Sequence, residues 1–346
     1  GWANRDTAYR FADYALEVFE HLKDRVTDWT TLNEPWCSSF LSYAGGEHAP
    51  GHTNPEEAVA AAHHLLLGHG LATGAMREVA DKDHRLGITL NFTVADPANP
   101  ANAVDVDAAR RIDGAFNRIF LDPIFRGQYP TDVLEDMAEA GLERHIRGND
   151  LEVIAAPIDV LGVNYYNGEL VAGPTTPPAP DESLVFASDR GLPRRSPIVG
   201  SEQVGRAWRD LPRTAMGWEV QPEGLERLLL RLEEHYTGPA GIPMVITENG
   251  AAYDDVADES GFVDDSGDRL SFIDAHLRAT HRAMEQGADV RGYLVWSLMD
   301  NFEWSFGYDK RFGIVRVDYD TQARIPKASA KWYAQVAASH RLPARR

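Results

Sequence analysis

The strongest constraint on the fold is the alternation of short apolar segments with longer segments of helical spacing. Five apolar runs of strand length cover residues 26–33, 85–92, 158–166, 243–250 and 290–300. These runs are apolar throughout, which is typical of parallel strands buried on both faces, whereas half-exposed strands alternate apolar and polar residues. The pattern therefore predicts an α/β fold built around a buried parallel sheet.

Helices are expected between and around these runs. Residues 5–25 place apolar side chains at helical spacing, with Asp6 as the expected N-cap. A long helix is expected over 54–80, with Asn54 capping it and Pro55 at its first position. The other expected helices cover residues 105–125, which would end at a proline, 222–236, 268–287 and roughly 326–338.

The length of the chain allows one domain or two. An α/β barrel can accommodate 346 residues in one domain, and we expect a single catalytic barrel domain over 1–346. The irregular segment 168–213, which contains "GPTTPPAPDE", is expected to be a long surface loop, with a linker between domains as the alternative. Five strands would form an incomplete barrel with two unpaired edges, because a (β/α)8 barrel has eight strands.

Composition narrows the classes of partner and cofactor. The net charge of −19 argues against nucleic acid and anionic membranes as partners, and no apolar run reaches membrane-spanning length. Cys37 is the only cysteine, which excludes an internal disulfide and fits a reducing, cytoplasmic location. The chain begins at Gly1, so a secretion signal is left open. No cysteine or histidine cluster has metal-ligand spacing, and no metal or cofactor is expected.

Two of the strand-like runs end on a glutamate. Glu34 lies in "TTLNEPW" at residues 30–36, and Glu248 lies in "MVITENG" at residues 244–250. Functional groups in parallel α/β folds gather at the carboxyl ends of strands, and glycosidic bond cleavage needs two carboxyl groups. Either glutamate alone could be a helix N-terminal residue or an exposed loop charge. Their shared position favours a catalytic pair.

Further motifs resemble the β-glucosidases of glycoside hydrolase family 1. They are "TLNEPW", "HAPG", "VNYY", "MGWEV", "ITENGA", "VWSLMDNFEWSFGYDKRFGIVRVDY" and "IPKASAKWY", and they occur in the family's order from Gly1 to about Trp332. The resemblance implies a (β/α)8 barrel and a retaining β-glycosidase. It also implies that the five strands are the family's strands four to eight.

The resemblance implies roles for the residues around the two glutamates. Glu34 would be the general acid/base and Glu248 the nucleophile. Asn33 would hydrogen-bond the sugar 2-hydroxyl, an interaction that strengthens in the transition state. Tyr166 would hold and tune the nucleophile, with Asn164 nearby.

The resemblance also implies contacts with the substrate. Trp296 would form the sugar platform, Glu303 and Trp304 would bind the 4- and 6-hydroxyls, and Phe306 would wall the same subsite. The residues that would line the aglycone side are Trp218, Trp36 and Cys37.

Each of these contacts has a structural alternative. Trp296 and Trp218 could be core tryptophans, although an indole face suits the C–H side of a pyranose. Glu303 could be a solvated loop acid, but aromatic residues flank it on both sides. Asn164 could serve only to satisfy backbone groups at a strand end, and Cys37 could be a small buried hydrophobe.

The expected substrate is an O-linked β-glucoside or a cello-oligosaccharide. Glu303 would repel a 6-phosphate, and the presence of Glu34 argues against a thioglucosidase, whose leaving group needs no proton. The sequence does not fix the aglycone, the choice between glucoside, galactoside and fucoside, or the oligomeric state.

The family's first three strands, with a glutamine, a histidine and an arginine of the sugar site, have no counterpart here, and Ala215 replaces an aspartate of the family's pattern. The chain alone is therefore expected to be a poor enzyme. An inactive barrel fragment and one half of a split enzyme remain as alternatives. The resemblance further implies a cis peptide bond between Trp296 and Ser297, and the retaining mechanism implies carboxyl groups about 5–5.5 Å apart.

Overall fold

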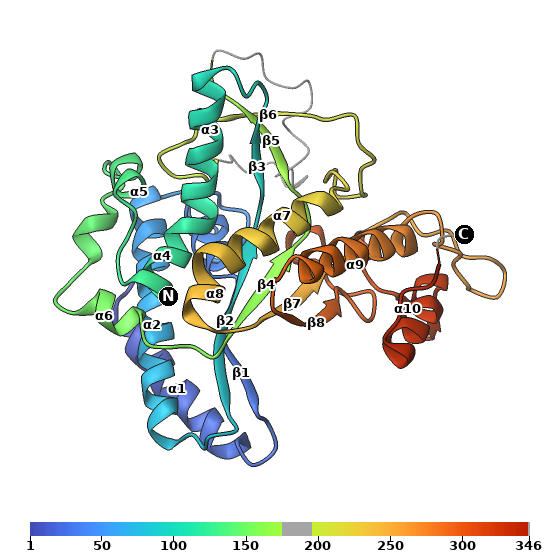
Figure 1. The fold of residues 1–346 in the computed structure, drawn as a ribbon, viewed down its shortest axis with the longest axis horizontal. Coiled ribbons are helices and arrows are strands. Elements are labelled where there is room, and N and C mark those ends of the chain that lie inside the picture. Colours follow the sequence, from blue (N-terminus) through green and yellow to red (C-terminus); the bar gives the residue numbers. More distant parts are fainter. Residues whose placement is uncertain (175–195, 345–346) are drawn as a thin grey trace.

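A five-stranded sheet lies at the centre of the molecule (Figure 1). The computed structural model describes residues 1–174 and 196–344. The strands of this sheet follow one another in chain order, and all four neighbouring pairs are parallel. They are β1 (Asp28–Asn33), β2 (Arg85–Phe92), β4 (Val160–Tyr165), β7 (Met244–Asn249) and β8 (Val290–Val295). All five expected strands are therefore present, in the expected order.

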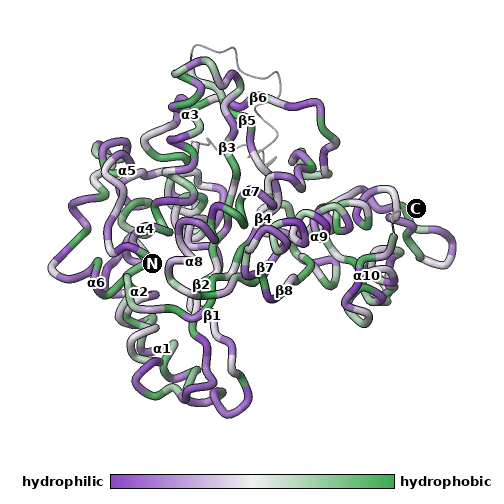
Figure 2. The backbone as a smooth tube through the Cα atoms, in the orientation of Figure 1, coloured by the Kyte–Doolittle hydropathy of each residue, from purple (hydrophilic) through white to green (hydrophobic). Residues whose placement is uncertain are grey.

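Burial differs between the interior and the edges of the sheet. Five of the six residues of β4 are buried, whereas none of the six residues of β1 is. Strand β8, at the opposite edge, has one buried residue. Figure 2 shows hydrophobic stretches along β2 and β4 and a mainly polar β1. The expectation that all five strands are buried on both faces is therefore wrong for β1 and β8, because each has a neighbouring strand on one side only.

Two helices pack against each other beside β1 and β2. These are α1 (Asp6–Leu22) and α2 (Pro55–Val79). The side chain of Asn54 accepts hydrogen bonds from the backbone of Glu56 and Glu57, which confirms it as the cap of α2. Asp6, in contrast, is the first residue of its helix, and Arg5 stands at the N-cap. In the first turn the carboxylate of Asp6 meets the positive end of the helix dipole without capping it.

The helix expected over 105–125 is longer than predicted and contains a wide turn. It comprises α3 (Ala103–Asp113), a π turn (Gly114–Arg118) and α4 (Ile119–Arg126). Pro123 lies inside α4 and does not end the helix. Burial of neighbouring apolar side chains, among them Ile119 and Ile124, holds this turn helical despite the lost backbone donor. The helix ends one turn later, at Gly127, whose left-handed backbone suits glycine.

The remaining helices follow the later strands. The segment expected as one helix over 222–236 is α7 (Pro222–Leu232), a π turn (Glu233–Thr237) and α8 (Gly238–Ala240). Helix α7 packs against α9 (Arg269–Glu285), and α9 in turn contacts α10 (Ala328–Ser339).

Several short elements have no signal in the sequence. Strands β3 (Ala95–Pro97), β5 (Glu169–Ala172) and β6 (Gly205–Ala207) form a separate sheet, and β9 (Val315–Val317) pairs with β10 (Arg324–Pro326). The short helical segments are α5 (Thr131–Asp136), α6 (Asp150–Ile154), the π turn Cys37–Leu41, and the 3-10 turns Leu142–His145 and Trp304–Phe306. Elements this short show no usable periodicity.

The expected surface loop over 168–213 has regular structure at its described ends. Strands β5 and β6 lie there and pair with each other, so this part of the segment is held in a sheet. Residues 175–195 lie outside the described residues. No helix within the two described ranges is long and apolar enough to cross a membrane.

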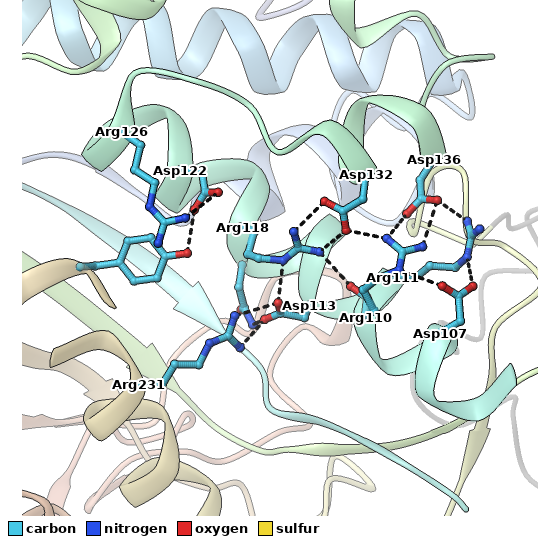
Figure 3. A network of polar contacts seen from close by, with 12 residues as sticks. Asp107, Arg110, Arg111, Asp113, Arg118, Asp122, Arg126, Asp132, Asp136 and Arg231 are labelled. Atoms are coloured by element: carbon cyan, nitrogen blue, oxygen red, sulfur yellow. Dashed lines mark hydrogen bonds and ion pairs between the residues drawn. The ribbon is translucent and has the colours of Figure 1, made fainter. Parts of the chain in front are cut away.

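An ion-pair network joins the helices on the outside of the sheet (Figure 3). Arg118, in the π turn after α3, pairs with Asp113 and with Asp132 of α5. Arg231 of α7 also pairs with Asp113. The network thereby ties three helical segments that are distant in the sequence.

Candidate active site

The two glutamates lie at the same end of the central sheet, where the carboxyl ends of its parallel strands meet. Glu34 follows the last residue of β1, and Glu248 is the fifth of the six residues of β7. Strand β4 pairs with β7, and Asn164 of β4 stands in register with Glu248. All of these positions are at the carboxyl ends of parallel strands, where functional groups gather in parallel α/β folds.

A chain of hydrogen bonds connects the two carboxyl groups. The Tyr166 hydroxyl donates to Glu248 Oε2 at 2.6 Å, and Asn33 Nδ2 donates to Glu248 Oε1 at 3.2 Å. Asn164 Nδ2 donates to Asn33 Oδ1 at 3.0 Å and to Glu34 Oε1 at 2.8 Å. The structure thus brings together all four residues expected around the catalytic step, with Asn164 between them.

The amide of Asn164 is held in one orientation. Its side chain is fully buried, and its Oδ1 accepts a hydrogen bond of 2.6 Å from Thr247 Oγ1. Because the oxygen is engaged on this side, the amino group must point toward Asn33 and Glu34. Thr247, adjacent to Glu248 in "TENG", was missed as a site residue because nothing in the sequence shows where its hydroxyl points.

Glu34 has a second partner and an unusual backbone conformation. The Cys37 thiol donates to Glu34 Oε2 at 3.1 Å, so the cysteine lies beside the carboxyl group and is not only a core residue. The φ angle of Glu34 is 50°, in the left-handed region. That conformation costs a non-glycine residue about 1–2 kcal/mol and often occurs at functional sites.

Burial dominates the electrostatics of both carboxyl groups. Removal from water raises the pKa of Glu34, and the hydrogen bonds from Asn164 and Cys37 oppose this rise. Burial, followed by the charge of Glu34, raises the pKa of Glu248 to about 7, against the hydrogen bonds from Tyr166 and Asn33. Two carboxyl groups with raised pKa values in one site are typical of acid–base and nucleophilic catalysis.

Aromatic side chains gather beside Glu248. Four of the expected site residues pack around one small buried cluster, and these four are Tyr166, Trp218, Trp296 and Phe306. The rings of Tyr166 and Trp218 have centroids 5.4 Å apart. The peptide bond between Trp296 and Ser297 is cis, as the resemblance implies.

Glu303 lies on the loop that follows β8. Burial raises its pKa to about 7, a hydrogen bond from Asn301 opposes the rise, and the charge of Glu34 adds to it. Glu303 is therefore within electrostatic reach of Glu34. Its neighbour Trp304 is 65% exposed and stacks on His48, with ring centroids 5.4 Å apart.

A second loop contacts the loop after β8. Ser305 Oγ donates to Glu47 Oε1 at 2.7 Å, next to the stack of His48 on Trp304. The motif "HAPG" contains His48, but the sequence alone assigned it no contact. The presence of this motif was the one feature of the sequence that could have pointed to a role for the second loop.

Trp36 packs into the hydrophobic core beside the site. It is 3% exposed, belongs to the main hydrophobic core and packs on Phe116 with ring centroids 4.2 Å apart. The residue is the N-cap of the π turn Cys37–Leu41, which follows Glu34 and Pro35. The aglycone contact expected for Trp36 stays a prediction.

Gly250 fixes the spacing between the end of β7 and the loop after β8. A Cβ atom at this position would lie 1.7 Å from the backbone oxygen of Trp296. Only glycine permits this approach. The glycine of "TENG" therefore sets the distance between the segment of Glu248 and that of Trp296.

A metal site is not evident near these groups. Within the part of the chain that the structure describes, no set of three or more histidine, cysteine, aspartate or glutamate residues could hold a metal ion. The chemistry that the arrangement offers is that of two neighbouring carboxyl groups with aromatic and amide side chains around them. This combination is typical of glycoside hydrolases built on parallel β/α scaffolds.

Comparison with known proteins identifies the family of glycoside hydrolases to which the chain belongs. The model of glycosyl hydrolase family 1 matches residues 1–342, and the chain belongs to this family. It is a glycoside hydrolase.

Several relatives carry named activities. The chain is 43% identical to a bifunctional β-D-glucosidase/β-D-fucosidase of Bifidobacterium breve, over 98% of this chain and 70% of the relative. Among solved structures, a psychrophilic β-glucosidase from Micrococcus antarcticus is 53% identical with a TM-score of 0.93, over 99% of this chain and 71% of that chain. The family 1 β-glucosidase of Thermotoga maritima is 41% identical with a TM-score of 0.86, over 99% and 71%.

The raised pKa of Glu248 makes the site a source of instability at alkaline pH. A carboxyl group whose pKa rises from 4.5 to about 7 on folding stabilises the protein fully below pH 4.5, and this stabilisation is lost as the pH rises through about 7. We expect Glu248→Gln to raise the free energy of unfolding at pH 8 by about 3 kcal/mol relative to its effect at pH 4. Chemical denaturation at the two pH values measures this difference.

Glu17→Gln on the exposed face of α1 is the matched control, because its carboxylate is 70% exposed. If both variants changed the free energy of unfolding equally at both pH values, the destabilisation assigned to the raised pKa of Glu248 would be contradicted.

Proposed function

We propose that this glycoside hydrolase removes terminal non-reducing β-D-glucosyl residues by retaining double displacement, with Glu248 as nucleophile and Glu34 as general acid/base. The observation that carries the proposal is the chain of hydrogen bonds from Glu248 through Asn33 and Asn164 to Glu34. It links two half-buried carboxyl groups through the amides of Asn33 and Asn164.

In the first step Glu248 attacks the anomeric carbon. The bond from this carbon to the leaving oxygen breaks, and Glu34 donates its proton to that oxygen. Tyr166 and Asn33 hydrogen-bond the two oxygens of Glu248. These bonds favour the ionised form that the attack requires, against the burial that favours the neutral form.

In the second step Glu34 acts as a base. It accepts a proton from water, the water oxygen attacks the anomeric carbon, and the ester to Glu248 breaks. The loss of the negative charge on Glu248 in the intermediate lowers the pKa of Glu34, so that it holds its proton in the first step and accepts one in the second. A retaining reaction of this kind requires carboxyl groups about 5–5.5 Å apart.

The sugar subsite is proposed to lie between Trp296, which begins the loop after β8, and residues 303–306 further along that loop. Trp296 offers an aromatic face, Glu303 with Trp304 binds the 4- and 6-hydroxyls, and Phe306 closes the wall. Support comes from the shared cluster of Trp296 and Phe306 and from the burial of Glu303 near Glu34. The proposed residues on the aglycone side are Trp218, Trp36 and Cys37.

The proposed substrates are β-glucosides, including cello-oligosaccharides. One relative is named for activity on both β-D-glucosides and β-D-fucosides, which differ in the configuration at C4 and in the hydroxyl at the 6-position. A solved relative from Thermotoga maritima carries deoxynojirimycin. The single cysteine supports a reducing location such as the cytoplasm.

We further propose that residues 1–346 form one catalytic domain whose five parallel strands are strands four to eight of a (β/α)8 barrel. Support comes from the strand order and from the shared length, since the chain covers 71% of each of two related solved structures. The half-exposed strands β1 and β8 are the two edges at which such a barrel would close.

The acid/base role of Glu34 is tested with Glu34→Ala. General acid help is worth about 10²–10⁴-fold, and a poor leaving group needs it most. We therefore expect kcat/KM to fall by that factor on an alkyl β-glucoside and far less on an activated aryl β-glucoside. Added azide restores turnover of the aryl substrate and yields a β-glycosyl azide.

Cys37→Ala serves as the control for a change beside the carboxyl group. It keeps the proton donor, so azide brings no rescue. Equal losses of Glu34→Ala on both substrate classes, or an α-glycosyl azide as product, would contradict the role of Glu34.

If the five strands belong to a (β/α)8 barrel, the unpaired edges of β1 and β8 leave the site open to water and should lower the turnover rate. We expect the 346-residue chain to turn over an aryl β-glucoside at least tenfold more slowly than the same chain joined to the first three strands of a family member, because closure excludes water from the charged site. Steady-state rates of the two purified proteins make the comparison. Comparable rates would show that the five-stranded sheet suffices.

A further inference from the structure

A cluster of buried charges adjoins the loop that carries Glu303. It contains three acidic and three basic side chains, and five of the six are at most 2% exposed. Its members are Asp255, Asp265, Arg269, Asp300, Arg311 and Lys327. The mechanism proposed above uses none of them.

Asp300 has a donor at each of its available positions. Its Oδ1 accepts from Lys327 Nζ at 2.9 Å and from the backbone of Gly313 at 3.1 Å. Its Oδ2 accepts from Arg311 Nη1 at 2.6 Å and from the backbone of Val317 at 3.2 Å. One carboxylate therefore joins the beginning of the loop after β8 to the segment in which that loop returns.

The link from Asp300 to Glu303 is short. Backbone hydrogen bonds between Ser297 and Phe312 and between Asp300 and Val315 close the base of the same loop. The next residue, Asn301, donates from Nδ2 to Glu303 Oε2 at 3.3 Å. The position of the Glu303 carboxylate thus depends on a backbone segment that Asp300 holds.

Two basic side chains extend the cluster to the loop after Glu248. Lys327 pairs with Asp255 of that loop as well as with Asp300. Arg269 donates from Nε to the backbone oxygen of Ala251 at 3.2 Å and from Nη2 to that of Arg311 at 2.7 Å. A single guanidinium therefore bridges the backbone of the two loops that follow β7 and β8.

Buried ion pairs are weak evidence for stability, because desolvation offsets much of their attraction. Their directional bonds, however, fix geometry, and a guanidinium with several acceptors allows little freedom. The cluster lies where such fixing affects the sugar, since one loop follows the nucleophile and the other carries Glu303.

We propose that this charge cluster is a positioning device that holds Glu303 relative to Glu248, and that it thereby sets the preference of the subsite for sugars with a 6-hydroxyl. Asp300 and Lys327 are its positioning residues, and they act through the loop after β8. The inference rests on the proposed function, in which Glu303 binds the 4- and 6-hydroxyls.

The test compares two inhibitors by calorimetry, so it does not require turnover. One is the gluco-configured iminosugar deoxynojirimycin, and the other is its xylo-configured analogue, which lacks the hydroxymethyl group. The measured quantity is the ratio of their dissociation constants. In Lys327→Met and in Asp300→Asn we expect the preference for deoxynojirimycin to fall about tenfold, which corresponds to one hydrogen bond to a charged group.

Asp132→Asn is the matched control, because it removes a carboxylate from the ion-pair network of Figure 3, where its partners are Arg110 and Arg118. It lowers the thermal midpoint but leaves the inhibitor ratio unchanged. If the cluster only stabilises the fold, Lys327→Met and Asp300→Asn would also lower the thermal midpoint without changing the inhibitor ratio. An inhibitor ratio within twofold of the wild-type value in both variants would overturn the inference.

The wild-type chain separates the two levels of the argument. If it binds both inhibitors with equal affinity, the role of Glu303 fails, and the inference fails with it. If it prefers deoxynojirimycin and both variants keep that preference, only the positioning role is overturned.

Discussion

The geometry of the site depends on the side chain of Asn164. This amide accepts a hydrogen bond from Thr247 and donates to Asn33 and Glu34, so it touches residues from β1 and β7 while standing on β4 between them. A buried amide with its oxygen already engaged has one remaining orientation, and the orientation of the carboxyl groups follows from it. The parallel sheet brings the strand ends together, but the amide fixes the distances between their side chains.

Charged groups that are partly or fully removed from water serve two different purposes in this molecule. At the site, Glu34 and Glu248 lie together with hydrogen-bond donors but without a basic side chain bonded to either in the described residues, and both pKa values are raised. In the cluster around Arg269 and Lys327, acidic and basic groups balance. The first arrangement keeps carboxyl groups reactive at a cost in stability, and the second holds the surrounding loops in place.

Sequence reasoning succeeded where a feature depends on neighbours in the chain. The runs 85–92 and 158–166 became β2 and β4, Asn54 caps its helix, and both glutamates lie at strand ends. It failed where distant contacts decide. The residues near Pro123 do not show that packing keeps its helix intact. The residues near Trp36 do not show that its ring packs on Phe116, eighty positions later.

The same limit applies to the site and to its surroundings. The motifs around Glu34, Glu248 and Glu303 are local and could be read from the sequence. The contact between Glu47 and Ser305 spans 258 positions, and only the folded chain brings these residues together. Three-residue strands such as β3 and β6 form because a neighbouring strand is present, and their own residues contain too little information to predict them.

The close approach at Gly250 has a consequence for how such a protein can diverge. Since a Cβ atom there would lie 1.7 Å from the backbone oxygen of Trp296, any mutation of this glycine separates the two segments on which bond cleavage and sugar stacking depend. Selection for a new substrate cannot adjust this distance in small steps. Adaptation to other glycosides can instead act on exposed loop residues such as Trp304, which is 65% exposed, while the spacing at the centre is inherited unchanged.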